Sequence, residues 1–209
     1  KLHYGEAVSP AKENLDSIKI GSVEIAMVCT AYHPGKNPAM TGLDLPFLPF
    51  ADLDVQQRVH EAYYKHPAVL QEMKRWNAVA IFSNLLPQSE FMGTGAPPKT
   101  LEDWKGKRVR AIGGIGDAMR ALGAVPTSMP APEVYTSLER GMVSAASLPF
   151  TYNHIAMRLH EISQWYTVNM APGSSHCPTV VSLPAMNALP AEYRKILEGA
   201  YPAGYALLK

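Results

Sequence analysis

Short apolar runs alternate with segments of helical pattern along the whole chain of 209 residues. Each apolar run is too short for a helix and is bounded by glycine, proline or polar turn residues, which is typical of buried strands. Strands are expected at 23–28, 79–82, 108–112, 125–129, 143–147, 165–169 and 179–183. Helices are expected at 10–18, 52–64, 67–76, 132–140 and 153–159, after the glycines at 113–116, and from Pro190 onward. This alternation predicts an α/β fold with a largely parallel sheet.

The balance of charge excludes two classes of partner. Nineteen lysines and arginines face eighteen aspartates and glutamates, for a formal net charge of +1. Proteins that bind nucleic acid or anionic membranes normally carry a basic surface, so we expect neither partner. No apolar run reaches the ~18 residues that a membrane span needs, and the first six residues have no apolar signal-peptide core.

Two cysteines, Cys29 and Cys177, are too few for a disulfide scaffold. A single bridge between them and two buried free thiols are both compatible with the sequence. The cellular compartment therefore stays open at this point.

Arg110 is the most informative polar residue. It lies near the carboxyl end of an expected strand, between Val109 and Ala111, just before a glycine-rich helix start. Ligands of open α/β sheets lie at the carboxyl ends of strands, and a partly buried guanidinium needs an anion. Because guanidinium pairs with a carboxylate through two parallel hydrogen bonds, the position predicts a site for a small carboxylate. The alternative is an internal salt bridge to Glu133, Glu90 or Asp117, while Arg108 is expected to face solvent.

The turn Gly113–Gly116 allows a second function, an α/β enzyme with a nucleotide cofactor. The dinucleotide fingerprint is incomplete, because Met119 stands at the third glycine position and Glu133 lies at a helix start. A plain strand-to-helix turn is the simpler interpretation. The seven histidines show no metal-ligand spacing, and no nucleophile elbow is present, so neither a metal site nor a catalytic residue is expected.

Several motifs in order resemble one family. The segment 101–110, LEDWKGKRVR, is similar to the "DLKGLKIR" stretch of the DctP-like solute-binding proteins of TRAP transporters, and 133–143, EVYTSLERGMV, to their "EVYTALQTGVV". Further matches are GSVEIA at 21–26, LPF at 45–47, ALGAVP at 121–126 and ALP at 188–190. The resemblance extends over nearly the whole chain.

The resemblance implies a periplasmic, two-lobe binding protein that captures an organic acid for a membrane permease, without catalysis or cofactor. One lobe would hold residues 1–87 and 176–209 and the other 88–175, each a sheet flanked by helices, with the ligand cleft between them. The family's ligand-clamping arginine falls on Arg110, and the loop Cys29–Tyr32 would line the cleft from the other lobe. The expected lining residues are Arg110, Tyr32, Thr30, Asn84, Glu90, Ser147, Phe150 and His176.

The chain departs from the family at positions that bear on the ligand. Some members carry a second basic residue about twenty positions before the arginine, where this chain has Gln88 and Glu90. If Glu90 faces the ligand, it should favour one with a hydroxyl or amine opposite the carboxylate. Leu148 and Ala131 make the expected pocket less polar than in many members. Family members are also longer, so the chain resembles a fragment.

Overall fold

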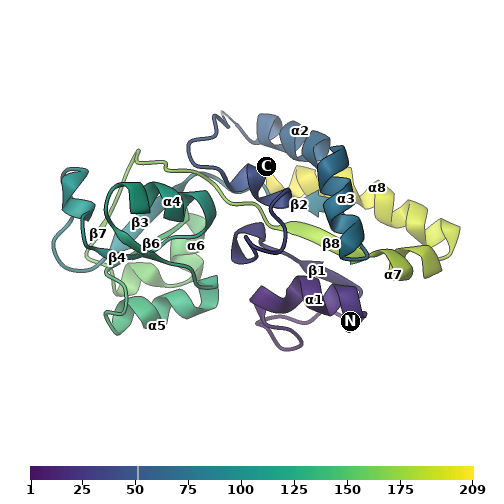
Figure 1. Ribbon diagram of the computed structural model, residues 1–209, viewed down its shortest axis with the longest axis horizontal. Helices are drawn as coiled ribbons and strands as arrows, with labels where there is room; N and C mark the ends of the chain where they lie inside the picture. Colours follow the sequence, from purple (N-terminus) through teal and green to yellow (C-terminus); the bar gives the residue numbers. More distant parts are fainter. Residues whose placement is uncertain (51) are drawn as a thin grey trace. The chain divides into compact units, whose positions relative to one another are not determined.

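The computed structural model describes residues 1–50 and 52–209, which divide into two compact units. The first unit holds residues 1–43, 49–85 and 176–209, and the second holds 44–48 and 86–175. Each unit has its own sheet (Figure 1). Each also has its own hydrophobic core. The chain thus leaves the first unit twice, at residues 44 and 86, and returns to it at residues 49 and 176.

The sheet of the first unit has three strands in the order β1 (Ile25–Met27), β8 (Pro178–Ser182), β2 (Ala78–Ser83). Both outer strands pair antiparallel with β8. The helices of this unit are α1 (Asn14–Ile20), α2 (Leu53–Tyr64), α3 (Pro67–Arg75), α7 (Leu183–Ala188) and α8 (Ala191–Leu208). Apolar side chains of α1 and α3, with Val180 of β8, form the core.

Local chemistry places the helix starts in this unit as the sequence predicts. The Asp52 side chain accepts a hydrogen bond from Val55 N at 2.7 Å, which caps α2. Pro67 occupies the first turn of α3, where its missing N–H costs nothing.

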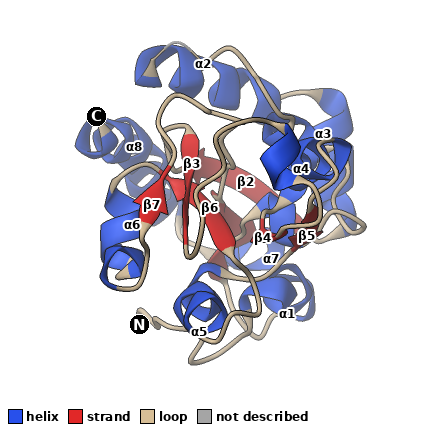
Figure 2. Ribbon diagram, turned by 90° about the vertical axis from the view of Figure 1, so that its left-hand side faces the viewer, coloured by secondary structure: helices blue, strands red, loops and turns tan. Residues whose placement is uncertain are grey.

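The sheet of the second unit has five strands in the order β5 (Val125–Thr127), β4 (Arg108–Arg110), β6 (Ala145–Pro149), β3 (Ser89–Gly93), β7 (Trp165–Tyr166). Strand β4 is parallel to β5 and β6, whereas β3 is antiparallel to β6 and β7. Its helices are α4 (Gly113–Ala121), α5 (Val134–Glu139) and α6 (Tyr152–Ala156), seen beside the strands in Figure 2.

Two apolar clusters cover the two faces of this sheet. Ile115 and Met119 of α4 pack with Val109 and Phe91 on one face. Val134 and Leu138 of α5 pack with Leu148 on the other. Because side chains alternate along a strand, Arg110 lies on the α5 face, opposite to its neighbour Val109.

The prediction of an α/β fold is confirmed, but the prediction of a largely parallel sheet is wrong. The first sheet is antiparallel and the second is mixed. Strand β3 and helix α7 were not expected, because Ser89–Glu90 interrupts the apolar pattern of β3 and α7 follows β8 without a break. The antiparallel strands enter each sheet after the chain has crossed from the other unit, and hydrophobic periodicity carries no signal for such a return.

Cys29 and Cys177 form a disulfide next to the pairing of β1 with β8, which resolves the alternative left open by the sequence. Within the described residues, no helix combines the length and the apolar character required to cross a lipid bilayer.

Candidate functional site

Arg110 ends strand β4 and is almost entirely buried, with 2% of its surface exposed. Its Nε and Nη2 donate to the carbonyl oxygen of Met129 at 3.1 and 3.0 Å, and its Nη1 donates to that of Ser147 at 2.6 Å. The Ser147 hydroxyl donates back to the Arg110 carbonyl at 3.3 Å. Main-chain groups of two neighbouring segments therefore fix the position of the guanidinium, and an orientation fixed before binding suits recognition of a planar anion.

Two of the acidic residues considered as internal partners of Arg110 have other contacts. Asp117 pairs with Arg120 on the exposed side of α4. The Glu90 carboxylate accepts from the Thr167 hydroxyl and from Ala171 N. Arg108 behaves as expected, because it is exposed and donates to the Gly141 carbonyl at 2.7 Å.

Glu90 lines a pocket of about 230 Å³ in the second unit. The other lining residues are Pro87, Gln88, Phe150, Val168, Asn169 and Ala171. Glu90 itself is 4% exposed, and its two carboxylate oxygens receive one hydrogen bond each from Thr167 and Ala171. The pocket thus combines apolar walls with a buried carboxylate.

Phe150 forms a fixed aromatic wall of this pocket. Its ring stacks on Tyr166 at 6.2 Å between centroids and meets the edge of His154 at 6.0 Å. His154 Nε2 lies 3.1 Å from the Glu90 carbonyl oxygen. Burial lowers the pKa of His154, against the smaller upward effect of the Glu90 contacts, so this ring is neutral at pH 7. The structure therefore brings Glu90 and Phe150 together at one pocket.

Thr30 and His176 also come together, in the first unit. The Thr30 hydroxyl lies 3.2 Å from His176 Nδ1 and donates to the His176 carbonyl at 3.3 Å. Both residues are buried beside the disulfide. The His176 ring contacts the rings of His60 and Tyr64, at 5.6 and 6.2 Å between centroids.

His60 is the titratable centre of that aromatic cluster. Burial, together with the nearby His176, lowers the pKa of His60 to about 3. Its ring is therefore neutral at pH 7 and serves packing. Tyr32 ends the same short 3-10 turn as Thr30 and is half-buried, and the Asn84 side-chain amide donates to Met27 Sδ at 3.4 Å.

The glycine turn at the start of α4 has a packing role. A side chain at Gly114 would lie 2.3 Å from the carbonyl oxygen of Asp44, so only glycine permits this close approach. Gly113 adopts a positive φ of 52°. The tight turn thus has a structural explanation, and the nucleotide-cofactor alternative finds no support.

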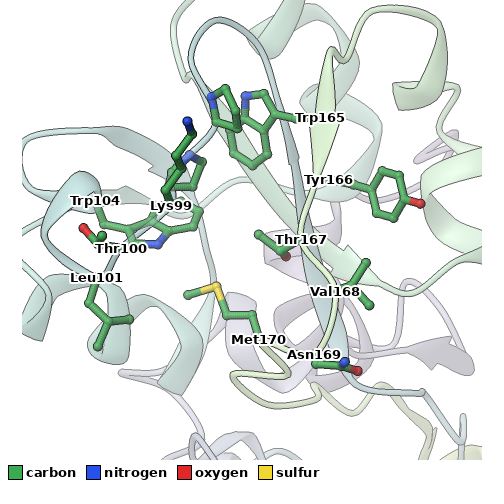
Figure 3. Close-up of a pocket in the computed structure, with 12 residues that line it drawn as sticks. Lys99, Thr100, Leu101, Trp104, Trp165, Tyr166, Thr167, Val168, Asn169 and Met170 are labelled. Atoms are coloured by element: carbon green, nitrogen blue, oxygen red, sulfur yellow. The ribbon is translucent and has the colours of Figure 1, made fainter.

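A larger pocket, of about 470 Å³, is lined in part by residues 165–170. Figure 3 shows Trp104, Lys99 and Met170 around it, with Tyr166 directed away. It shares only Val168 and Asn169 with the pocket at Glu90, and no carboxylate lines it. Among the described residues, no group of three or more histidine, cysteine, aspartate or glutamate side chains is arranged to hold a metal ion.

The sequence did not single out several residues that the structure places around Glu90. Val168, Asn169 and Ala171 follow β7 by a few positions but lie about 80 residues beyond Glu90 in the chain. Gln88 was noted only for its position before Glu90. No local pattern links these segments, because the contact arises from the pairing of β3 with β7.

Comparison with known proteins agrees with this architecture. The monocarboxylate 2-oxoacid-binding periplasmic protein of Nostoc is 29% identical over 201 residues, covering 94% of this chain and 54% of the relative. The chain thus spans about half the length of the curated relatives it matches.

Two solved structures show the same fold. One is DctP7 of Bordetella pertussis, an extracytoplasmic solute receptor binding pyroglutamic acid, with a TM-score of 0.86 at 20% identity over all of this chain and 69% of that one. The other is a TRAP periplasmic solute-binding protein of Pseudomonas aeruginosa with bound L-malate, with a TM-score of 0.81 at 15% identity over 97% of this chain and 70% of that one. The fold is therefore that of the two-lobe periplasmic binding proteins.

The family profile gives the clearest assignment. Residues 6–205, nearly the entire chain, match the DctP profile, described as bacterial extracellular solute-binding protein, family 7. The chain belongs to this family of solute-binding proteins.

Proposed function

We propose that this chain is the ligand-binding part of a periplasmic protein that captures a small organic acid for a TRAP-type membrane permease, without catalysing a reaction. The observation that carries the proposal is the buried guanidinium of Arg110, oriented by the carbonyl oxygens of Met129 and Ser147. A guanidinium held in this way can donate to a carboxylate without reorganising. The family assignment supports the same conclusion, because family members are receptors for solutes.

Two further observations support the proposal. The disulfide between Cys29 and Cys177 is typical of proteins exported to an oxidising compartment such as the periplasm. The two compact units correspond in outline to the expected lobes, with residues 44–48 grouped with the second unit. Thr30, Tyr32, Asn84 and His176 remain proposed lining residues from the first unit, and Glu90, Ser147 and Phe150 from the second.

Calorimetry with a panel of organic acids tests the proposal on the unmodified protein. The panel contains monocarboxylates, dicarboxylates, a uronate and pyroglutamate, and each binder is compared with its primary amide. We expect at least one acid to bind and its amide to bind at least tenfold more weakly, because the amide carries no charge for the guanidinium. Binding of NAD and of no acid would overturn the proposal in favour of a cofactor enzyme.

The Arg110→Lys variant then tests the assigned residue. An ammonium is a point charge and does not reproduce the two parallel hydrogen bonds, so we expect affinity for the acid to fall 10- to 100-fold. Arg108→Lys is the matched control, since it lies on the same strand but is exposed, and it should bind as the unmodified protein does. Melting curves without ligand establish that both variants fold. Equal affinity in the two variants would show that Arg110 is not the anchor.

A further inference from the structure

We infer that the pocket at Glu90 receives a hydrogen-bond donor of the ligand, so that the protein selects monocarboxylates bearing a hydroxyl or amino group and discriminates against dicarboxylates. This inference rests on the proposed function, because it concerns the second end of a ligand whose carboxylate is held by Arg110.

The polar groups of the pocket are one carboxylate, from Glu90, and the amides of Gln88 and Asn169, which can both donate and accept hydrogen bonds. Among these, the Oε1 of Gln88 is a buried acceptor that makes no hydrogen bond within the described residues. None of the described lining residues is a lysine, arginine or histidine, and Phe150, Val168, Pro87 and Ala171 supply apolar walls. A buried acceptor without a partner is unfavourable, so a donor entering this pocket gains more than an acceptor or a methyl group would.

The carboxylate of Glu90 retains capacity for a ligand. Each of its oxygens has two lone pairs, and the structure gives each oxygen one donor, Ala171 N at 3.0 Å and the Thr167 hydroxyl. These two donors hold the carboxylate in place. A hydroxyl or ammonium group of the ligand would complete the set of hydrogen bonds.

Strand register relates this pocket to Arg110. Glu90 lies opposite Leu148 of β6, and Arg110 lies opposite Ala146 of the same strand. The offset of two residues puts both side chains on one face of the sheet. With about 4.8 Å between strands and about 3.3 Å per residue, the two Cα atoms are roughly 12 Å apart. The Arg110 guanidinium donates to the carbonyl oxygen of Ser147, which immediately precedes Leu148, the residue opposite Glu90.

The sign of the charge then decides between ligand classes. A dicarboxylate anchored at Arg110 would bring its second carboxylate toward that of Glu90, which is 4% exposed, and like charges repel strongly in a buried site. A hydroxyl group meets no such repulsion, and an ammonium group is attracted. The relative with bound L-malate takes a dicarboxylate, so this pocket would set the present chain apart from it.

A matched series of four-carbon acids tests the inference by calorimetry. Butyrate, 4-hydroxybutyrate, 4-aminobutyrate and succinate share one carboxylate and differ at the far end, and L-malate and pyroglutamate are measured beside them. We expect the hydroxy and amino acids to bind at least tenfold more tightly than butyrate and succinate. A dicarboxylate as the tightest binder, or equal affinities across the four-carbon series, would overturn the inference while leaving the proposed function intact. If no acid binds, both fail.

Two substitutions sharpen the test. Glu90→Gln removes the charge at constant size, and we expect the affinity for succinate to rise at least tenfold relative to that for 4-aminobutyrate. Gln88→Leu removes the amide acceptor and should reduce the advantage of 4-hydroxybutyrate over butyrate. Glu102→Gln is the control, because Glu102 is exposed in the same unit and lies outside the pocket. An unchanged succinate preference in Glu90→Gln would overturn the inference, and if that variant does not fold, the series on the unmodified protein decides.

Discussion

Each unit buries one glutamate whose carboxylate accepts two hydrogen bonds, yet the surroundings of the two differ. In the first unit, Glu72 accepts from Ala39 N at 2.8 Å and from Met40 N at 2.9 Å, and Arg75 lies 3.6 Å away. In the second unit, Glu90 accepts from Thr167 and Ala171 and also lines a pocket. The first carboxylate connects a loop to a helix, whereas the second borders a pocket.

Other buried polar groups follow the same division. The first unit holds a disulfide and the neutral His60 beside His176, all packed in its interior. The second holds the guanidinium of Arg110, which stays charged at every physiological pH. Burial is common to both sets of groups, and a permanent charge or an adjoining pocket is what distinguishes the two residues proposed to bind a ligand.

The largest expected effect on stability comes from removing the disulfide, which lies in the first unit. Replacing both Cys29 and Cys177 by serine frees a loop closed over 148 residues, which costs about 5 kcal/mol of stability by the chain-entropy relation. Hydrogen exchange should report this loss in β1 and β8 of the first unit, because the two cysteines lie next to the ends of these strands. Protection lost first in the strands of the second unit would contradict this division.

A second, smaller effect is the loss of folding stability at low pH, which arises from buried histidines of the first unit. His60 has a pKa of about 3 in the folded protein against about 6.5 for an unperturbed histidine, so the unfolded chain binds more protons between these values. Stability from this group is complete above about pH 6.5 and is lost as the pH falls, by roughly 2 to 3 kcal/mol between pH 7 and 4.5. His33, with a pKa lowered to about 4 chiefly by burial, acts in the same direction within the same unit.

Denaturant unfolding at the two pH values measures this effect. His60→Leu should reduce the pH dependence, because the group that must protonate is gone. His3→Gln is the control, since His3 is exposed. An identical pH dependence in His60→Leu and the unmodified protein would rule out His60 as the source.

The third and smallest expected effect is the difference between the variants Glu72→Gln and Glu90→Gln. Glu72→Gln replaces charge-assisted hydrogen bonds with neutral ones and should lower stability by about 2 kcal/mol without changing ligand affinity. Glu90→Gln should cost less stability and change ligand preference instead. The pair is measured by denaturant unfolding and calorimetry on the same preparations. A change of ligand preference in Glu72→Gln would contradict the assignment of a purely structural role to Glu72.

The sequence predicted the elements of this fold better than their pairing. Most strands and helices were found within a few residues, because apolar periodicity and caps such as Asp52 and Pro67 act locally. Whether a strand is parallel or antiparallel depends here on whether the chain has just crossed from the other unit. The local sequence pattern contains no information on this crossing. Arg110 stood out because a charge inside an apolar strand is costly, whereas Val168 and Asn169 are ordinary residues that reach the pocket only through the pairing of β7.

The disulfide also encloses the second unit topologically. Cys29 and Cys177 stand before and after the whole of residues 44–48 and 86–175, so every residue of that unit lies inside one covalent ring. A protease that cuts an exposed segment there leaves two pieces joined through sulfur. Such a nicked molecule migrates as one band without reductant and as two with it, and it can remain assembled after damage that would separate an open chain.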